Sequence, residues 1–181
     1  MNFEEPYPDL AEEISASSSF DVERAAGKGG HADVLVVRHK LLGTRHVAKA
    51  IRTSDPALTA ELTKRLLREG RVIAELRHRG IMQVTDFAFT PSGRAYMVAE
   101  YVNGRTLKQV VRERGPMDVA EALEIGAQIA SALAAAHAAG VVHRDIKPDN
   151  VMLLDGELTV KVLDFGIAKV VDDALAHLVA D

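Results

Sequence analysis

The stretch from residue 143 to 166 constrains the fold more than any other part of this sequence. It begins with His143-Arg144-Asp145-Ile146-Lys147-Pro148-Asp149-Asn150 and ends with Asp164-Phe165-Gly166. Between these polar ends, the apolar segments 151–154 and 158–163 flank Asp155-Gly156, a strong signal for a tight turn between antiparallel strands. The sequence therefore predicts two polar loops that are held together by one hairpin.

Acids, a lysine and an amide on two such loops suit phosphoryl transfer. One carboxylate can align a hydroxyl nucleophile, while a second carboxylate and an amide hold magnesium on nucleotide phosphates. The alternative is that this stretch is only a charged loop and a scaffold hairpin. The chemical interpretation is favoured because four suitable groups occur together at fixed spacing, namely Asp145, Lys147, Asn150 and Asp164.

The same residues resemble the catalytic motifs of eukaryotic-type, bacterial-like protein kinases, and Lys147 points to the Ser/Thr branch. The resemblance covers about residues 20 to 170. It implies an α+β, two-lobed kinase-like fold, with an antiparallel sheet and one regulatory helix in the N-lobe and an incomplete, mainly helical C-lobe. It also implies ATP and Mg²⁺ as cofactors and a protein serine or threonine as the phosphate acceptor.

The resemblance assigns a role to each polar group of the stretch. Asp145 accepts the proton of the substrate hydroxyl and aligns its oxygen, and Lys147 offsets the charge of the moving phosphoryl group. Asn150 completes the catalytic set. Asn150 and Asp164 supply oxygen ligands for Mg²⁺.

A glycine-rich segment near the start of the chain is the second candidate site. Gly27-Lys28-Gly29-Gly30 lies between a predicted strand over 20–26 and another that runs through Lys40. Glycines allow a backbone to approach phosphates closely, although such a segment is more often only a turn. In the family the segment covers the ATP phosphates, and Ala32 replaces the usual third glycine.

Two further charged residues carry a structural and a functional interpretation. Lys49 lies on a predicted strand over 45–51, where it is either an edge charge or the lysine that anchors the nucleotide. Glu69 lies on a predicted amphipathic helix over 57–77, where it is either a surface acid or the ion-pair partner of Lys49. The resemblance favours the functional role for both.

A predicted hairpin over 81–89 and 94–101 leads into a connector that ends near Asn103-Gly104. By resemblance, backbone groups of Glu100 and Val102 bind the adenine edge, and Ala99 leaves the back of the pocket deep. Thr85 is expected to be a buried hydroxyl without a partner, which weakens support for the regulatory helix. The remaining residues assigned to the nucleotide pocket are Val34, Val47 and Met152.

The domain boundaries follow from changes in pattern along the chain. Residues 1–19 are predicted to be a flexible acidic leader because they hold few apolar groups. Residues 20–102 form the N-lobe and 103–181 a partial C-lobe, which contains a helix over 118–139 and a short strand at Val141-Val142. His137 on that helix is expected to pack in the core.

Composition narrows the function classes. The chain has no cysteine, no metal-ligand spacing among its seven histidines and no apolar run predicted to span a membrane, so a cytoplasmic location is expected. Five of the 26 acidic residues lie in the first 20 positions, ahead of all 22 lysines and arginines, so the rest of the chain has a formal charge of +1. Nothing in this balance calls for nucleic acid.

The family pattern extends beyond the last residue of this sequence, Asp181. After Gly166 the sequence has no serine, threonine or tyrosine, and no peptide-binding platform is recognisable. Three hypotheses remain: a fragment of an active kinase, an ATP-binding regulatory module without phosphotransfer, and a piece that docks on another chain. Uncovered apolar surface on the C-lobe would favour self-association or a partner chain.

Overall fold

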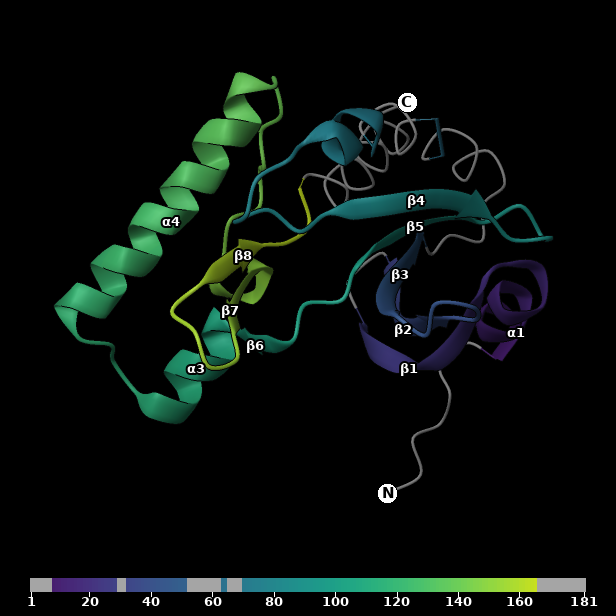
Figure 1. Cartoon of the computed structure of the whole chain (residues 1–181), viewed down its shortest axis with the longest axis horizontal. Helices are drawn as coiled ribbons and strands as arrows, with labels where there is room; N and C mark the ends of the chain where they lie inside the picture. The colour runs from purple at the N-terminus through teal and green to yellow at the C-terminus, as the bar shows by residue number, and fades with distance from the viewer. Residues whose placement is uncertain (1–7, 29–31, 52–62, 65–69, 166–181) are drawn as a thin grey trace, which may run out of the picture. The chain divides into compact units, whose positions relative to one another are not determined.

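The computed structural model describes residues 8–28, 32–51, 63–64 and 70–165. They form two compact units, one drawn from Met1–Leu67 and Val84–Tyr101, the other from Arg68–Gln83 and Val102–Lys169. Each unit has its own antiparallel sheet (Figure 1). The predicted α+β class is confirmed.

A five-stranded antiparallel sheet, in the order β1-β2-β3-β5-β4, forms most of the first unit. Gly43 and Gly93 occupy turns of this sheet with φ angles of 67° and 87°, a region that glycine adopts without strain. The predicted strands are confirmed. They are β1 (Phe20–Lys28), β2 (Ala32–His39), β3 (Arg45–Ile51), β4 (Val84–Phe89) and β5 (Ala95–Glu100).

The prediction of a flexible leader is wrong for its described part, because Pro8–Ser17 form helix α1. Leu10 and Ile14 lie one helical turn apart and are both fully buried. They join a core made with the sheet, and this burial attaches the helix to it. The other members of this core are Phe20, Leu35, Val37, Ala48, Ala50, Tyr96 and Val98.

Polar contacts also attach α1 to the sheet. The Lys40 ammonium donates hydrogen bonds to the carbonyls of Ser15 (2.5 Å) and Ser18 (2.9 Å), which satisfies backbone acceptors at the end of the helix. The Ser92 hydroxyl donates to the Glu13 carboxylate at 2.7 Å. Hydrogen bonds from Thr90 and Ser92 lower the pKa of Glu13.

The described part of the second unit contains α3, α4, a helical stretch over residues 70–75 that lies within the predicted helix over 57–77, and a three-stranded sheet in the order β6-β7-β8. The predicted hairpin is confirmed, and Gly156 in its turn has a φ of 78°. The core consists of Val110, Ile125, Val151, Leu153 and Val160. The elements are β6 (Gly104–Thr106), α3 (Leu107–Arg114), α4 (Val119–Ala138), the 3-10 helix η1 (Pro148–Asn150), β7 (Val151–Leu154) and β8 (Val160–Val162).

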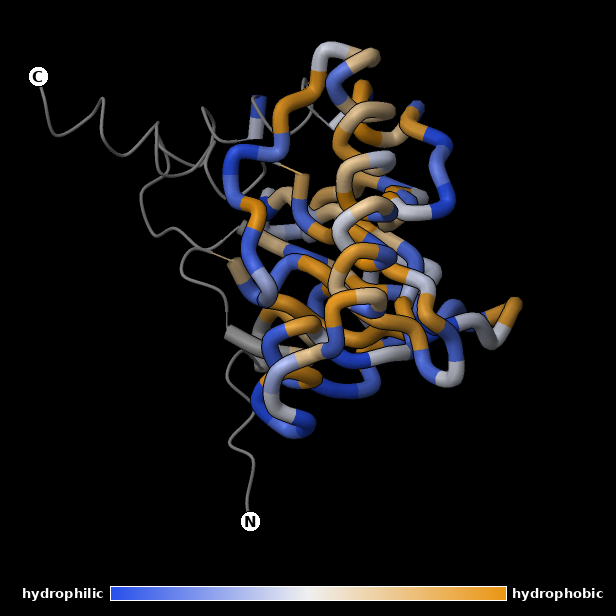
Figure 2. The backbone as a smooth tube through the Cα atoms, turned by 90° about the vertical axis from the view of Figure 1, so that its left-hand side faces the viewer, coloured by the Kyte–Doolittle hydropathy of each residue, from blue (hydrophilic) through white to orange (hydrophobic). Residues whose placement is uncertain are grey.

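Helix α4 confirms the predicted helix over 118–139. Asp118 caps its first turn by accepting a hydrogen bond from the backbone N–H of Glu121. The helix is long and apolar enough to cross a membrane, a criterion that core helices also meet, so the expectation of no such stretch is corrected. Apolar colours run along much of it in Figure 2. Val119 and Leu123 on it are 77% and 68% exposed.

Four details differ from the sequence predictions. Val141-Val142 lie outside any strand. Residues 68–83 belong to the second unit because the N–H of Met82 donates to Val162 and the N–H of Val162 donates to Gly80. The Thr85 hydroxyl has a partner, since it donates to the carbonyl of Val98 at 3.2 Å. His137 is exposed instead of packed.

Candidate active site

The site is built on the loop from His143 to Asn150, between α4 and β7. His143 is 1% exposed, and both of its ring nitrogens have partners. Nε2 lies 2.6 Å from the carbonyl oxygen of Leu163, and Nδ1 accepts a hydrogen bond from the backbone N–H of Asp145 at 3.2 Å. This pattern requires the neutral ring with its proton on Nε2. Burial lowers the pKa of His143, which favours that neutral form.

Asp145 lies at the centre of the loop and is contacted by the two other predicted catalytic residues. The Lys147 ammonium is 2.7 Å from its Oδ2 atom. The Asn150 amide nitrogen donates to the same Oδ2 at 3.0 Å and to the backbone carbonyl of Asp145 at 2.9 Å. The structure thus brings together the predicted catalytic set.

These contacts keep the carboxylate of Asp145 ionised. The hydrogen bond from Lys147 is the largest cause that lowers the pKa of Asp145, and the hydrogen bond from Asn150 acts in the same direction. Conversely, the hydrogen bond to Asp145 raises the pKa of Lys147, and the charges of Asp149 and Asp164 add to this effect. Since about a third of the Asp145 side chain is exposed, a substrate group can reach it.

Leu163 links this loop to Asp164. Its N–H donates to the carbonyl of Asn150 at 2.8 Å, and its own carbonyl is the acceptor for the His143 ring. Both backbone polar groups of the residue before Asp164 are therefore bound to the catalytic loop. The sequence only implied that Asn150 and Asp164 lie at a fixed distance from each other. The two hydrogen bonds of Leu163 explain how this distance is fixed.

Two non-glycine residues of the site adopt left-handed backbone conformations. The φ angles are 63° at Arg144 and 52° at Asp164. Such residues carry strain of order 1 kcal/mol or more, and they persist where the surroundings determine them and often at functional sites. The ring of Phe165 packs edge-on against the ring of His143, with ring centroids 4.7 Å apart. This contact holds the backbone that directly follows Asp164.

Asn150 and Asp164 fit the predicted role of magnesium ligands. Both supply oxygen donors, which Mg²⁺ prefers, and the amide nitrogen of Asn150 is already directed at Asp145, which leaves its oxygen as the donor. Among the described residues, no group of three or more His, Cys, Asp or Glu side chains is arranged to hold a metal ion. A site with two protein ligands suits Mg²⁺, because this ion commonly keeps several waters and binds phosphates.

The predicted nucleotide residues of the first unit lie mostly on neighbouring strands. Lys49 on β3 is paired with Val34 on β2 and with Met97 on β5. Val47 on β3 is paired with Ala99 on β5, and Ala99 is fully buried. Gly27 and Lys28 end β1. Glu100 ends β5.

The remaining predicted residues are in the second unit or outside the described part. Val102 is buried, and Met152 on β7 is half-buried and paired with Thr106 and Lys161. Gly29, Gly30 and Glu69 lie outside the described residues, so the predicted ion pair of Lys49 stays a prediction.

One contact at the site was not predicted. Lys108 on α3 lies 2.9 Å from the carboxylate of Asp149, which is part of η1. The sequence signal for α3 was the capping box Thr106-x-x-Gln109, in which each side chain binds the other residue's backbone N–H. Recognition of this pattern would have placed a helix directly after the connector.

Comparison with known proteins agrees with this geometry. The family model described as the protein kinase domain matches residues 20–179. Serine/threonine-protein kinase PknA of Mycobacterium tuberculosis is 38% identical over 169 residues, which cover 89% of this chain and 38% of PknA. A probable serine/threonine-protein kinase of Clostridium perfringens is 36% identical over 159 residues, which cover 87% of this chain and 23% of that protein.

Solved structures show the same likeness. The kinase domain of Mycobacterium tuberculosis PknI has a TM-score of 0.70 and 32% identity, over 82% of this chain and 59% of that one. Rad53 in complex with AMP-PNP has a TM-score of 0.72 and 29% identity, over 83% of this chain and 39% of that one. The chain thus spans about a quarter to two fifths of the curated relatives named above.

Proposed function

Because the chain belongs to the protein kinase domain family, we propose that it transfers the γ-phosphoryl group of ATP to a serine or threonine hydroxyl of a protein. The observation that carries the proposal is the joint anchoring of Asp145 and Asp164. Lys147 and Asn150 bind the Asp145 carboxylate, while Asn150 and His143 hold the residue before Asp164. These contacts support a joint role for the two loops in the transfer.

Asp145 is proposed to align the attacking hydroxyl and to accept its proton. Its lowered pKa makes it a weak base, so its main contribution is position. Hydrogen bonds from Lys147 and Asn150 converge on Oδ2, which leaves Oδ1 to contact the hydroxyl. Alignment of this kind can remove roughly 7 to 11 kcal/mol of barrier when all reactants are well oriented.

Lys147 is proposed to exchange its contact with Asp145 for one with the transferring phosphoryl group. Its raised pKa keeps it charged for this purpose. Asn150 and Asp164 would hold Mg²⁺ by their oxygens, and the ion would neutralise charge on the phosphates. Backbone strain at Asp164 suits this role, because such conformations persist where the surroundings determine them and often at functional sites.

ATP is proposed to contact the residues named on β1, β2, β3 and β5, the connector residue Val102, and Met152. The complex of Rad53 with AMP-PNP supports this proposal, since that protein is similar over 83% of this chain. Lys49 would bind the phosphates and Glu69 would orient it. Backbone groups of Glu100 and Val102 would bind the adenine.

The decisive experiment separates binding from transfer. Mg²⁺–ATP should raise the melting temperature of the unmodified chain, and labelled γ-phosphate should appear on a generic acceptor such as myelin basic protein or casein. Asp145→Asn should keep the thermal shift and lower transfer by about 10² to 10⁴-fold. Asp86→Asn, an exposed aspartate on β4, is the matched control and should change neither result.

Two outcomes would contradict the proposal in different ways. A thermal shift without any transfer by the unmodified chain would indicate an ATP-binding module. If Mg²⁺–ATP did not raise the melting temperature at all, the proposal that the chain binds ATP would be wrong. If Asp145→Asn transferred phosphate as well as the unmodified chain, the proposed role of Asp145 would be wrong.

A further inference from the structure

We propose that the tip of the β2–β3 hairpin, formed by Leu41 and Leu42, inserts into the surface of a lipid bilayer that contains anionic phospholipids. Leu41 is 91% exposed and Leu42 is 71% exposed. Among the residues that the structure describes, no other large apolar side chain is as exposed as that of Leu41. Strands β2 and β3 are neighbours in the sheet of the first unit (Figure 1), so the tip lies at one end of that sheet. The proposal goes beyond the proposed function and does not depend on it.

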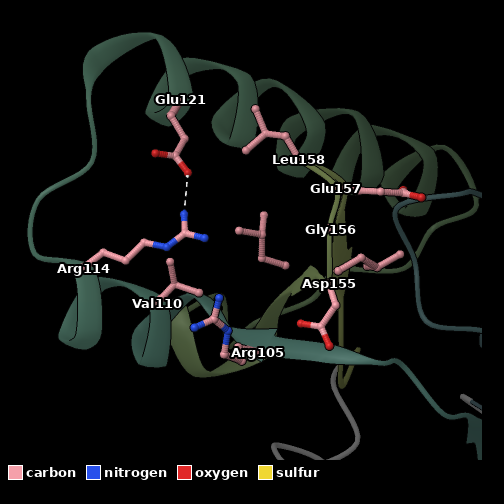
Figure 3. A pocket seen from close by; sticks show the side chains of 10 residues that line it. Arg105, Val110, Arg114, Glu121, Asp155, Gly156, Glu157 and Leu158 are labelled. Atoms are coloured by element: carbon pink, nitrogen blue, oxygen red, sulfur yellow. Dashed lines mark hydrogen bonds and ion pairs between the residues drawn. The ribbon is translucent and has the colours of Figure 1, made fainter.

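The apolar side chains at the surface of the second unit have a different setting. Leu158 is 41% exposed and borders a cavity together with the buried side chain of Val110. Charged side chains share this cavity, and Figure 3 shows the ion pair of Arg114 with Glu121 there. The two leucines of the tip are more exposed and follow each other directly in the turn. A single exposed leucine needs no explanation, but two adjacent ones form an apolar patch.

The backbone of the tip has its hydrogen-bond donors satisfied within the chain. The N–H groups of Leu41 and Leu42 both donate to Nδ1 of His39, each at 3.2 Å. The N–H of Gly43 donates to the carbonyl of His39 at 2.8 Å, and the N–H of Lys40 donates to a carbonyl at the end of α1, also at 2.8 Å. Burial of an unpaired N–H in an apolar medium is costly. Four consecutive residues of the tip avoid this cost.

The same bonds favour a lipid surface over a protein partner. Protein interfaces carry about one hydrogen bond per 100–200 Å² of buried area, and a tip without a free N–H contributes few of them. The turn is also held in shape, because the Arg38 guanidinium donates to the carbonyl of Gly43 at 2.7 Å. The tip is therefore a preformed apolar element, and little conformational entropy is lost when it inserts.

The charged side chains beside the hairpin suit an anionic surface. Arg38 and Arg45 both bind the carboxylate of Glu23, and their side chains are 44% and 53% exposed. Lys40 lies 3.9 Å from Asp21. These three bases and two acids have a net charge of +1. One net basic residue near an anionic bilayer strengthens binding by about fivefold at low salt.

Insertion of two leucines and attraction of one net charge should together give weak, reversible binding. Binding of this kind needs no segment that spans the membrane. None of the residues assigned to the nucleotide pocket or to catalysis lies between His39 and Thr44. Substitutions in the tip should therefore leave the Mg²⁺–ATP thermal shift unchanged.

The test is co-sedimentation of the unmodified chain with sucrose-loaded vesicles of phosphatidylcholine and phosphatidylserine at low salt. Binding should be saturable, and it should be about fivefold weaker with vesicles of phosphatidylcholine alone. Leu41→Gln/Leu42→Gln should weaken it by about tenfold or more, because both apolar side chains are lost. The matched control is Val119→Gln/Leu123→Gln on α4, which also replaces two exposed apolar side chains, 77% and 68% exposed, and should leave binding unchanged.

Two further variants test the charge and the insertion separately. Arg45→Gln should weaken binding to the anionic vesicles by about fivefold, whereas Arg112→Gln, at an exposed arginine of α3, should not change it. The chain has no tryptophan, so Leu42→Trp introduces a single fluorescent reporter. Its emission should move to shorter wavelength on addition of the vesicles and should be quenched by brominated lipid. Val119→Trp should show neither change.

The proposal fails if the unmodified chain does not sediment with the anionic vesicles, or if Leu41→Gln/Leu42→Gln sediments as well as the unmodified chain. Light scattering tests the alternative partner, since a dimer that dissociates in Leu41→Gln/Leu42→Gln would assign the tip to a second copy instead of lipid. All these measurements are made without nucleotide. Loss of the Mg²⁺–ATP shift with intact vesicle binding would contradict the proposed function alone.

Discussion

The catalytic loop over 143–150 and helix α1 are held in place by opposite means. The loop is mostly exposed, and its groups are connected by hydrogen bonds around Asp145. Helix α1 also has polar contacts with the sheet, but it buries Leu10 and Ile14 completely in the core. Polar side chains determine the geometry of the loop, while apolar side chains determine the stability of the helix.

This difference separates residues that serve the reaction from residues that serve the fold. The loop contains strained backbone at Arg144, which does not stabilise the unit. Helix α1 contains no residue assigned to the site. Substitutions in the loop should therefore change rate or pH response, whereas substitutions in α1 should change stability and leave the chemistry of the folded molecule alone.

Among the substitutions considered, Ile14→Ala should have the largest effect on the free energy of unfolding. Truncation of a fully buried isoleucine leaves a cavity, so we expect a loss of about 2 to 5 kcal/mol in the free energy of unfolding. Urea unfolding followed by circular dichroism measures this loss. Below the unfolding transition, the affinity of the folded chain for Mg²⁺–ATP should be unchanged, because α1 contributes no predicted nucleotide residue.

Glu12→Ala is the matched control for this substitution, since it also truncates a side chain of α1 to alanine but removes an exposed one. It should change the free energy of unfolding by less than about 0.5 kcal/mol. If Ile14→Ala were as mild as Glu12→Ala, the helix would not be part of the core, and the contrast between the two regions would fail.

The same contrast explains what the sequence could predict. The loop was identified residue by residue because phosphoryl transfer needs particular groups at particular spacing, from Asp145 to Asp164. Helix α1 was missed because its signal consists of two apolar residues, Leu10 and Ile14, among many polar ones. Their burial depends on a sheet face that forms from distant strands, which local pattern does not reveal.

An intermediate effect is expected at His143, where a buried ring supports the loop. The pKa of this histidine lies below its ordinary value of 6.5, mainly through burial. His143 therefore takes up a proton near pH 6.5 in the unfolded chain, but only at a lower pH in the folded chain. The stability from the neutral ring is present above that pH and is lost as the pH falls, by at most about 1.4 kcal/mol per pH unit.

His143→Gln should reduce this pH dependence of the free energy of unfolding between about pH 7.5 and about pH 5.5. The slope is the relevant measurement, because loss of the contact with Leu163 also lowers stability at every pH. The exposed residue His137 provides the control, and His137→Gln should keep the slope of the unmodified chain. If the free energy of unfolding of His143→Gln changed with pH as steeply as that of the unmodified chain, the buried ring would not be the source of this pH dependence.

Several features of the site were beyond sequence reasoning for a physical reason. The contacts of Leu163 with His143 and Asn150 are made by its backbone, which carries no residue-specific signal. The pair of Lys108 and Asp149 joins two segments whose proximity follows from the packing of α3. By contrast, the roles of Lys49 and Glu69 came from family resemblance, and for Glu69 the sequence pattern alone favoured an ordinary surface acid.

The smallest effect should come from the polar contact that attaches α1 to the β4–β5 turn. Ser92 donates to the Glu13 carboxylate, and hydrogen bonds from Thr90 and Ser92 hold the pKa of Glu13 below 4.5. Ser92→Ala should lower the free energy of unfolding at neutral pH by at most about 1 kcal/mol, because the pair is partly exposed. A carboxylate whose pKa is lowered stabilises the fold at a pH above its ordinary pKa and not at a pH well below it, so this loss should shrink as the pH falls below 4.5.

A double-mutant cycle with Glu13→Ala, measured by urea unfolding, isolates the coupling between Ser92 and Glu13. The same cycle with Glu12→Ala in place of Glu13→Ala should show no coupling. A coupling as large as the loss in Ile14→Ala would mean that α1, like the catalytic loop, is positioned by polar contacts.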